Sequence, residues 1–118
     1  FKQVNDRFSH AVGDIVLKRV AARLKADSRG FDLVARWGGE EFALLLPETT
    51  LAAARATCER LREGLMAIDF ADIDPALRIT ASFGVAEAGA LDSHHRLLLQ
   101  ADQALYRAKA NGRNRVEG

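Results

Sequence analysis

Apolar side chains recur every three or four residues in several segments, which is the spacing expected where one face of a helix is buried. In the first quarter of the chain it predicts a short helix ending near Ser9–His10 and a second helix running to about Lys25. Asp14 is expected to cap the second helix, because a carboxylate can accept from the free N–H groups of a first turn. The buried positions predicted for the second helix are Leu17, Val20, Ala21 and Leu24.

Two more helices are predicted further along the chain. Thr49 or Thr50 is expected to cap a helix over about Leu51–Ile68. Its predicted buried stripe is Leu51, Ala54, Cys58, Leu61, Leu65 and Ile68. The last helix is expected to start at Asp92 or Ser93 and to run to about Asn111, with Gly112 at the position after its C-cap. Its predicted core face is Leu97, Leu98, Ala101, Leu105 and Ala108.

Strand-like patterns lie between these helices. The apolar runs 31–35 and 42–46 flank a Gly-Gly pair, and this arrangement predicts a β-hairpin with the glycines at its turn. The unbroken run Leu44–Leu46 indicates a strand covered on both faces.

Later in the chain, residues 77–86 alternate and are rich in β-forming side chains, so a central strand is expected there after a loop over 70–76. A short final strand is expected over 113–116. A hairpin among helices predicts an α+β fold in two layers, with helices packed on a mainly antiparallel sheet.

Composition adds limits to this picture. The 118 residues suffice for a single domain, and 48% hydrophobic with 28% charged residues is ordinary for a globular protein. The net charge of +1 gives no overall basic or acidic bias, so any nucleotide or nucleic-acid contact must come from local clusters. No nucleic acid is among the expected partners. Cys58 is the sole cysteine, which excludes an internal disulfide and fits a reducing compartment. The sequence shows no signal peptide and begins at Phe1 without a methionine, so we expect a piece of a longer protein.

The most specific chemistry lies at the predicted turn. Gly38 and Gly39 allow a ligand to approach the backbone closely, and Glu40 and Glu41 follow them directly. Carboxylate oxygens are the ligands that Mg²⁺ prefers, but neighbouring strand residues point to opposite faces, so only one of the two acids can face a given ligand. The alternative is a pair of solvated charges at a hairpin tip.

Three other pairs have two interpretations each. Lys109 and Arg113, near the end of the last helix, suit a triphosphate, or they complement the helix dipole. An arginine and an aspartate three residues apart, Arg29 and Asp32, could each hold a guanine edge, or they form a surface ion pair. Asn5 and Asp14 together could recognise a base edge, and the alternative for Asp14 is the helix cap alone.

These motifs occur in one order along nearly the whole chain. The order resembles that of the GGDEF family, the diguanylate cyclases of bacterial cyclic di-GMP signalling. The residues that carry the resemblance are Phe1-Lys2-x-x-Asn5-Asp6-x-x-Ser9-His10-x-x-Gly13-Asp14, Arg29-x-x-Asp32, Arg36-Trp37-Gly38-Gly39-Glu40-Glu41-Phe42, Ser82-Phe83-Gly84-Val85-Ala86, and Ala101-Asp102-x-Ala104-Leu105-Tyr106-x-Ala108-Lys109-x-x-Gly112-Arg113-Asn114.

The resemblance assigns a role to each position that matches the family's motifs. It makes Glu40 the metal-binding acid and Glu41 the second catalytic acid, with Gly38 and Gly39 beside the nucleotide. The remaining assignments are Asn5 and Asp14 to guanine, Lys2, Lys109 and Arg113 to phosphates, and Arg29, Asp32 and Arg60 to an inhibitory product site.

The resemblance also implies an activity and partners. Two GTP molecules would become one cyclic di-GMP and two pyrophosphates, with Mg²⁺ or Mn²⁺ as cofactor and feedback inhibition by the product. The fold would be the nucleotidyl-cyclase or palm-like one. Each domain would hold one GTP, so catalysis would need a homodimer, controlled by an upstream sensory or receiver domain. The location would be cytoplasmic, and an upstream domain would be the place for any membrane anchor.

Three departures from the family pattern bear on activity. Ser9 replaces the glycine before the histidine, and Glu40 replaces the aspartate of the family name. The family's first strand, with a metal-binding aspartate, precedes the position of Phe1, so residues 1–118 are expected to be an N-terminally truncated GGDEF domain with weak or no activity alone. Two alternatives stay open: an inactive GGDEF-like module that binds GTP or cyclic di-GMP, and a structural dimerisation module.

Overall fold

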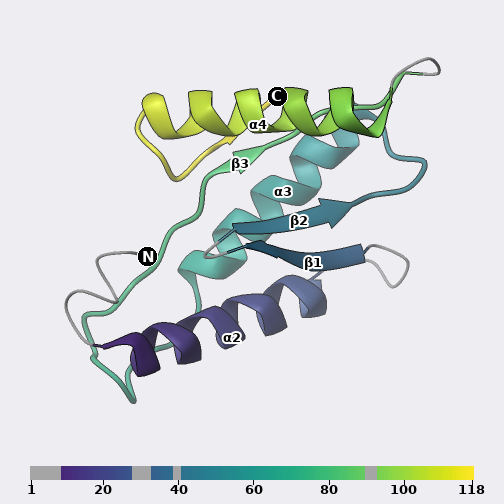
Figure 1. Cartoon of the computed structure of the whole chain (residues 1–118). Coiled ribbons are helices and arrows are strands. Elements are labelled where there is room, and N and C mark those ends of the chain that lie inside the picture. The colour runs from purple at the N-terminus through teal and green to yellow at the C-terminus, as the bar shows by residue number, and fades with distance from the viewer. Residues whose placement is uncertain (1–8, 28–32, 39–40, 90–92) are drawn as a thin grey trace. The chain divides into compact units, whose positions relative to one another are not determined.

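The structure is a computed structural model that describes residues 9–27, 33–38, 41–89 and 93–118. In chain order these residues form α2 (His10–Asp27), β1 (Leu33–Gly38), β2 (Glu41–Leu45), α3 (Leu51–Met66), β3 (Phe83–Gly84), α4 (His94–Ala110) and β4 (Val116–Glu117) (Figure 1). The chain divides into two compact units, Phe1–Pro47 with Gly64–Ile79, and Glu48–Glu63 with Thr80–Gly118. Helices and strands occur in both units, which fits the predicted α+β class.

Helix α2 begins earlier than the sequence predicts. The Ser9 hydroxyl accepts from the backbone N–H of Val12 at 3.1 Å, and the Ser9 carbonyl accepts from that of Gly13 at 3.0 Å. Ser9 is therefore the cap, and the prediction that Asp14 caps this helix is wrong, since Asp14 lies inside the helix and is exposed. The short helix expected before α2 lies outside the described residues except at its end, where His10 instead begins α2.

The core of the first unit joins α2 to the segment after α3. Val16 and Phe70 are fully buried and Leu77 is nearly so, and five half-buried apolar side chains pack against them, namely Val12, Val20, Ile68, Ile73 and Ile79. The Arg19 guanidinium lies 5.5 Å from the centre of the Phe70 ring, and its Nη1 donates to Asp72 Oδ1 at 2.7 Å. Residues 70–76 do form the predicted loop, but that loop supplies a core aromatic side chain.

The predicted hairpin is confirmed, but Gly38 is the last residue of β1, and the connecting residues 39–40 lie outside the described part of the chain. Strands β1 and β2 pair antiparallel from Leu33 opposite Leu45 to Gly38 opposite Glu41, with a register irregularity between Arg36 and Gly38. Helix α2 packs against β1 (Figure 1). The prediction of a strand covered on both faces is wrong at Leu45, which is 53% exposed.

Helix α3 matches its predicted start and buried face. The Thr50 hydroxyl accepts from the backbone N–H of Ala53 at 3.2 Å, so Thr50 is the cap. The helix ends at Met66, two residues before the predicted end. The side chains buried along its stripe are Ala54, Cys58, Leu61 and Leu65. The four are three or four residues apart, as one buried helix face requires.

The central strand expected over 77–86 is wrong for most of its length. Within residues 77–86, all of which the structure describes, only Phe83–Gly84 form a strand. This strand pairs parallel with Val116–Glu117. The Phe83 N–H donates to the Arg115 carbonyl at 2.9 Å, and the Val85 N–H donates to the Glu117 carbonyl at 2.9 Å. The described strands thus give one antiparallel and one parallel pair, so a mainly antiparallel sheet is not confirmed. Alternating apolar and polar residues indicate that one face of a segment is buried, but a strand also needs a neighbouring strand for its backbone hydrogen bonds.

Helix α4 lies directly on β3. Ser93 is its cap, because its hydroxyl accepts from the Arg96 N–H at 3.1 Å. A Cβ at Gly84 would lie 2.2 Å from the Ala101 carbonyl oxygen and 2.3 Å from the Leu105 nitrogen, so the helix backbone itself meets the strand. This closeness favours small side chains, and Ala104 and Ala108 are buried.

The buried face of α4 is therefore rotated from the predicted one. Leu98 was assigned to the core but is 46% exposed, so that assignment is wrong. Leu97, Ala101 and Leu105 are half-buried, and Ala108 is buried as predicted. Over the part of the chain that the structure describes, none of the helices has the length and apolar content to span a membrane.

Replacing Gly84 with alanine tests the contact between α4 and β3. The new methyl group would collide with backbone atoms, which cannot rotate away, so we expect a loss of roughly 1–3 kcal/mol in the free energy of unfolding. Urea denaturation measures this. Gly89→Ala, at an exposed loop position, is the control and should change stability by less than about 0.5 kcal/mol. Equal losses in the two variants would contradict the contact.

Cys58 should be unreactive in the folded chain. Cys58 is 5% exposed, and burial raises the pKa of its thiol from 9.0 to about 11. Because the thiolate is the nucleophile, alkylation by iodoacetamide at pH 8 should be roughly 100-fold slower in the folded chain than in urea, and should rise with pH toward that pKa. Rapid labelling of folded protein at pH 8 would show that Cys58 is accessible.

Candidate functional site

The hairpin tip holds the described part of the predicted acidic pair. Gly38 ends β1 and lies opposite Glu41, which begins β2. Glu41 is exposed, so its carboxylate is open to a ligand from solvent. Gly39 and Glu40 lie between the two strands and outside the described residues. A carboxylate beside a glycine at the end of a tight hairpin is suited to a metal ion or a phosphate-bound metal.

The metal prediction rests on Glu40, so it stays a prediction. Within the described ranges, no group of three or more His, Cys, Asp or Glu side chains could hold a metal ion. The chemistry of the tip nevertheless suits a hard cation, because Mg²⁺ commonly takes only one or two carboxylates and completes its shell with water and substrate phosphates. Glu41 is the described acid at this tip.

The predicted base-reading residues belong to the first unit. Asp14 is on α2, the helix that packs against β1, and its side chain is exposed. Since Ser9 caps the helix, the carboxylate of Asp14 is not needed there. Asn5 and the phosphate residue Lys2 lie outside the described part of the chain, as do Arg29 and Asp32 of the predicted inhibitory site.

Two predicted phosphate-binding cations lie at the C-terminal end of α4. Lys109 lies in the last turn of the helix, and Arg113 follows the helix by three residues and is exposed. Gly112 has φ 121°, and the Arg113 N–H donates to the Ala108 carbonyl at 2.9 Å. This is the bond that closes a Schellman-type helix end, and it confirms Gly112 as the residue after the C-cap.

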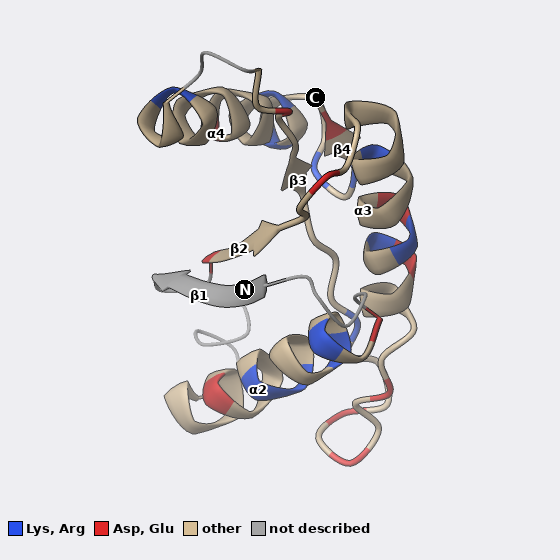
Figure 2. Cartoon of the chain, turned by 90° about the vertical axis from the view of Figure 1, so that its right-hand side faces the viewer, with Lys and Arg blue, Asp and Glu red and all other residues tan. Residues whose placement is uncertain are grey.

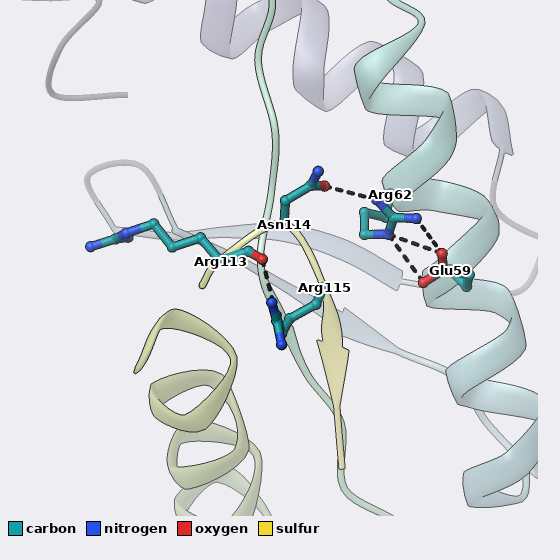
Figure 3. Close-up of polar contacts among 5 residues, drawn as sticks. All are labelled: Glu59, Arg62, Arg113, Asn114 and Arg115. Atoms are coloured by element: carbon teal, nitrogen blue, oxygen red, sulfur yellow. Dashed lines mark hydrogen bonds and ion pairs between the residues drawn. The ribbon is translucent and has the colours of Figure 1, made fainter. Parts of the chain in front are cut away.

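A polar network that the sequence did not predict lies beside this turn. Nη1 of Arg62 in α3 donates to Oδ1 of Asn114 at 2.8 Å, and Nε of Arg62 donates to the Glu59 carboxylate oxygens at 3.0 and 3.1 Å (Figure 3). A further bond joins Arg62 Nη2 to Glu59 Oε1. The side chain of Arg62 is 15% exposed. Hydrogen bonds from Arg62 lower the pKa of Glu59, so the carboxylate stays charged.

Helix α3 carries charged residues of both signs. Figure 2 shows basic and acidic residues interspersed along this helix. Arg60, the predicted secondary inhibitory residue, is exposed, whereas Arg62 is largely buried. Two residues along a helix correspond to about 200° of rotation, so Arg60 and Arg62 point in nearly opposite directions. The inhibitory role of Arg60 stays a prediction.

Comparisons with known proteins place this geometry in a family. The family model described as "Diguanylate cyclase, GGDEF domain" matches residues 1–115. The diguanylate cyclase DgcP of Pseudomonas aeruginosa is 45% identical over 117 residues, which are 99% of this chain and 17% of that protein. The response regulator PleD of Caulobacter vibrioides is 45% identical over 121 residues, covering 100% of this chain and 27% of that protein. The chain thus spans less than a third of either relative.

Solved structures agree with the sequence comparison. The GGDEF domain of DgcB from Caulobacter crescentus, in complex with c-di-GMP, has a TM-score of 0.90 at 34% identity, covering 98% of this chain and 70% of that one. The active GGEEF domain of a diguanylate cyclase from Vibrio cholerae has a TM-score of 0.89 at 31% identity, covering 98% and 74%. These similarities support an α+β, cyclase-like fold. The hairpin, the helix ends and the matches together show that this chain belongs to the GGDEF domain family.

Proposed function

We propose that this domain is a diguanylate cyclase that condenses two GTP molecules into cyclic di-GMP and two pyrophosphates. The observation that carries the proposal is the family match over residues 1–115 together with the hairpin-tip sequence Gly38-Gly39-Glu40-Glu41-Phe42. The same five residue types name the active GGEEF domain from Vibrio cholerae. Glutamate in place of the family aspartate at Glu40 is therefore compatible with activity.

The proposed reaction divides between base recognition, phosphate binding and phosphoryl transfer. Asn5 and Asp14 read the guanine edge, the amide by donating and accepting and the carboxylate by accepting. The 3′-hydroxyl of each GTP attacks the α-phosphorus of the other, and pyrophosphate leaves. Lys2, Lys109 and Arg113 hold the phosphates and favour the negative charge that develops on the leaving group.

A divalent metal ion is the cofactor that the family implies, and we infer Mg²⁺ or Mn²⁺. Glu40 would hold it, with Glu41 as the second acid at the tip. When bound, the ion would neutralise phosphate charge and lower the cost of forming the attacking alkoxide. Gly38 and Gly39 allow the nucleotide to approach the backbone, since neither has a Cβ.

The assembly follows from the chemistry of the reaction. Each domain holds one GTP, so two copies must face each other, and a homodimer controlled by an upstream sensory or receiver domain satisfies this need. The two-layer, mainly antiparallel palm-like arrangement and a cytoplasmic location, where GTP is available, belong to the same proposal. No described feature favours the inactive binding module or the structural dimerisation module.

Product inhibition is the last part of the proposal. Arg29 and Asp32 would bind cyclic di-GMP, since arginine can donate twice to guanine and a carboxylate can accept from it. Arg60 would add a contact from the exposed face of α3. The c-di-GMP complex of the DgcB GGDEF domain supports this chemistry in a related chain.

The Glu40→Ala variant of the full-length parent protein tests the activity. Because Glu40 is the proposed metal-binding acid, GTP turnover should fall by roughly 100-fold or more. Turnover is measured by chromatography of GTP and cyclic di-GMP. The control is Glu87→Ala, which removes an exposed acid outside the proposed site and should leave turnover unchanged. Turnover retained in Glu40→Ala would refute the assignment, and a wild-type parent without turnover would refute the proposed activity.

The Arg29→Ala variant tests the inhibitory site separately. Its initial rate should equal that of wild type, while added cyclic di-GMP should inhibit it about tenfold less strongly, because two donors to guanine are lost. The measurement is turnover against cyclic di-GMP concentration. Asp32→Asn should act in the same direction. Unchanged inhibition in both variants would place the product elsewhere.

A further inference from the structure

The backbone is strained in the residues that directly follow α4. Three successive residues have positive φ: Gly112 at 121°, Arg113 at 62° and Asn114 at 46°. Glycine adopts this region freely and asparagine tolerates it, but an arginine there is uncommon and costs free energy. Such a conformation persists only where the surrounding structure holds it. We name residues 112–114 the Arg113 turn.

Three elements of the same unit hold the Arg113 turn. The Ala108 carbonyl of α4 accepts from the Arg113 N–H at 2.9 Å. The Ser82 hydroxyl, next to β3, accepts from the Asn114 N–H at 3.2 Å. Arg62 of α3 donates to the Asn114 side chain at 2.8 Å. The first two bonds fix the backbone, and the third fixes the direction of the side chain that follows Arg113.

The bonds separate the side chains of Arg113 and Asn114. Figure 3 shows Asn114 turned toward Arg62, whereas the guanidinium of Arg113 extends away from this network. Arg115 folds back, and its Nε donates to the Arg113 carbonyl at 3.2 Å. The two arginines next to Asn114 in sequence therefore differ in role: Arg115 bonds the turn internally, and Arg113 is presented to solvent.

Arg62 is itself held in place. Its guanidinium bonds the Glu59 carboxylate through two nitrogens, which leaves Nη1 directed at Asn114. A planar guanidinium with a bidentate carboxylate partner has a fixed orientation. Helix α3 thus offers a rigid donor to the Arg113 turn, and the planar guanidinium of Arg62 bonds Glu59 and Asn114 at the same time.

We infer that Arg62, oriented by Glu59, is a positioning residue that holds Asn114 and so sets Arg113 for binding the phosphates of GTP. This rests on the proposed function, in which Arg113 contacts those phosphates. A phosphate-binding side chain fixed in advance loses less conformational freedom when the ligand binds. Arg62 therefore acts through Arg113 and does not touch the substrate.

The test is the Arg62→Met variant in the full-length parent protein. Methionine keeps the apolar stem but cannot donate to Asn114, so the KM for GTP should rise about tenfold while kcat changes less than about twofold. Asn114→Gly removes the same contact and keeps the positive φ available, so it should have the same effect. Arg62→Lys keeps one donor and should restore part of the affinity.

The matched control is Arg55→Met. Arg55 is on the same helix, carries the same charge, and donates to the Gly118 carbonyl at 2.9 Å. It does not bond the Arg113 turn in the described structure, so its substitution should leave the KM unchanged. Thermal unfolding of every variant separates loss of fold from loss of positioning. An Arg62→Met variant that fails to fold is replaced by Asn114→Gly.

The decisive measurement is made in the Arg113→Ala background. If Arg62 acts through Arg113, then adding Arg62→Met to Arg113→Ala should produce no further rise in KM, whereas an independent structural role would add a second loss. An unchanged KM in folded Arg62→Met and Asn114→Gly, or additive losses with Arg113→Ala, would overturn the inference.

Calorimetry measures GTP binding, rather than turnover, for wild type, Arg62→Met, Arg113→Ala and the double variant. A wild-type protein that binds GTP without converting it would refute the proposed activity, and the binding cycle would still support or overturn the role of Arg62. A wild-type protein that binds no GTP would overturn both the activity and the inference.

Discussion

The close contact between Gly84 and the backbone of α4 is the constraint on which the second unit depends. There is no room for a Cβ at Gly84, so the helix lies directly on β3. With the helix fixed there, the chain that leaves it at Gly112 must reverse within a few residues for β4 to pair parallel with β3. The positive φ values of residues 112–114 are the consequence of that short return.

The same turn of the chain also sets the direction of the Arg113 side chain. A reversal of this kind leaves the side chains of successive residues pointing in different directions, and here one is bonded to α3 while Arg113 extends to solvent (Figure 3). One turn thus allows the parallel pairing of β3 with β4 and also exposes Arg113, the cation proposed to bind phosphate.

Several elements could be predicted because their signals are local. Thr50 and Ser93 cap helices through residues three positions away, and the glycine turn specifies the hairpin through its neighbours. The cap prediction fails at Asp14 because Ser9, five residues earlier, is an equally good cap and the buried Gly13 does not end the helix. The sequence correctly predicts a loop at Phe70, but the burial of Phe70 depends on Val16, which is distant in sequence, as well as on the nearer Leu77.

The sequence by itself determined the family through several motifs in a fixed order, and the α+β class through the order of its helices and strands. It also located the hairpin tip with Glu41 and the cations Lys109 and Arg113 at the end of the last helix, because local motifs carry these features. Only the tertiary structure decided which helix face is buried on α4, which part of 77–86 is a strand, and which arginine of α3 bonds Asn114. Arg62 and Asn114 are 52 residues apart, and Ser82 and Asn114 are 32 apart. Contacts at such separations depend on how elements pack, which no local pattern specifies.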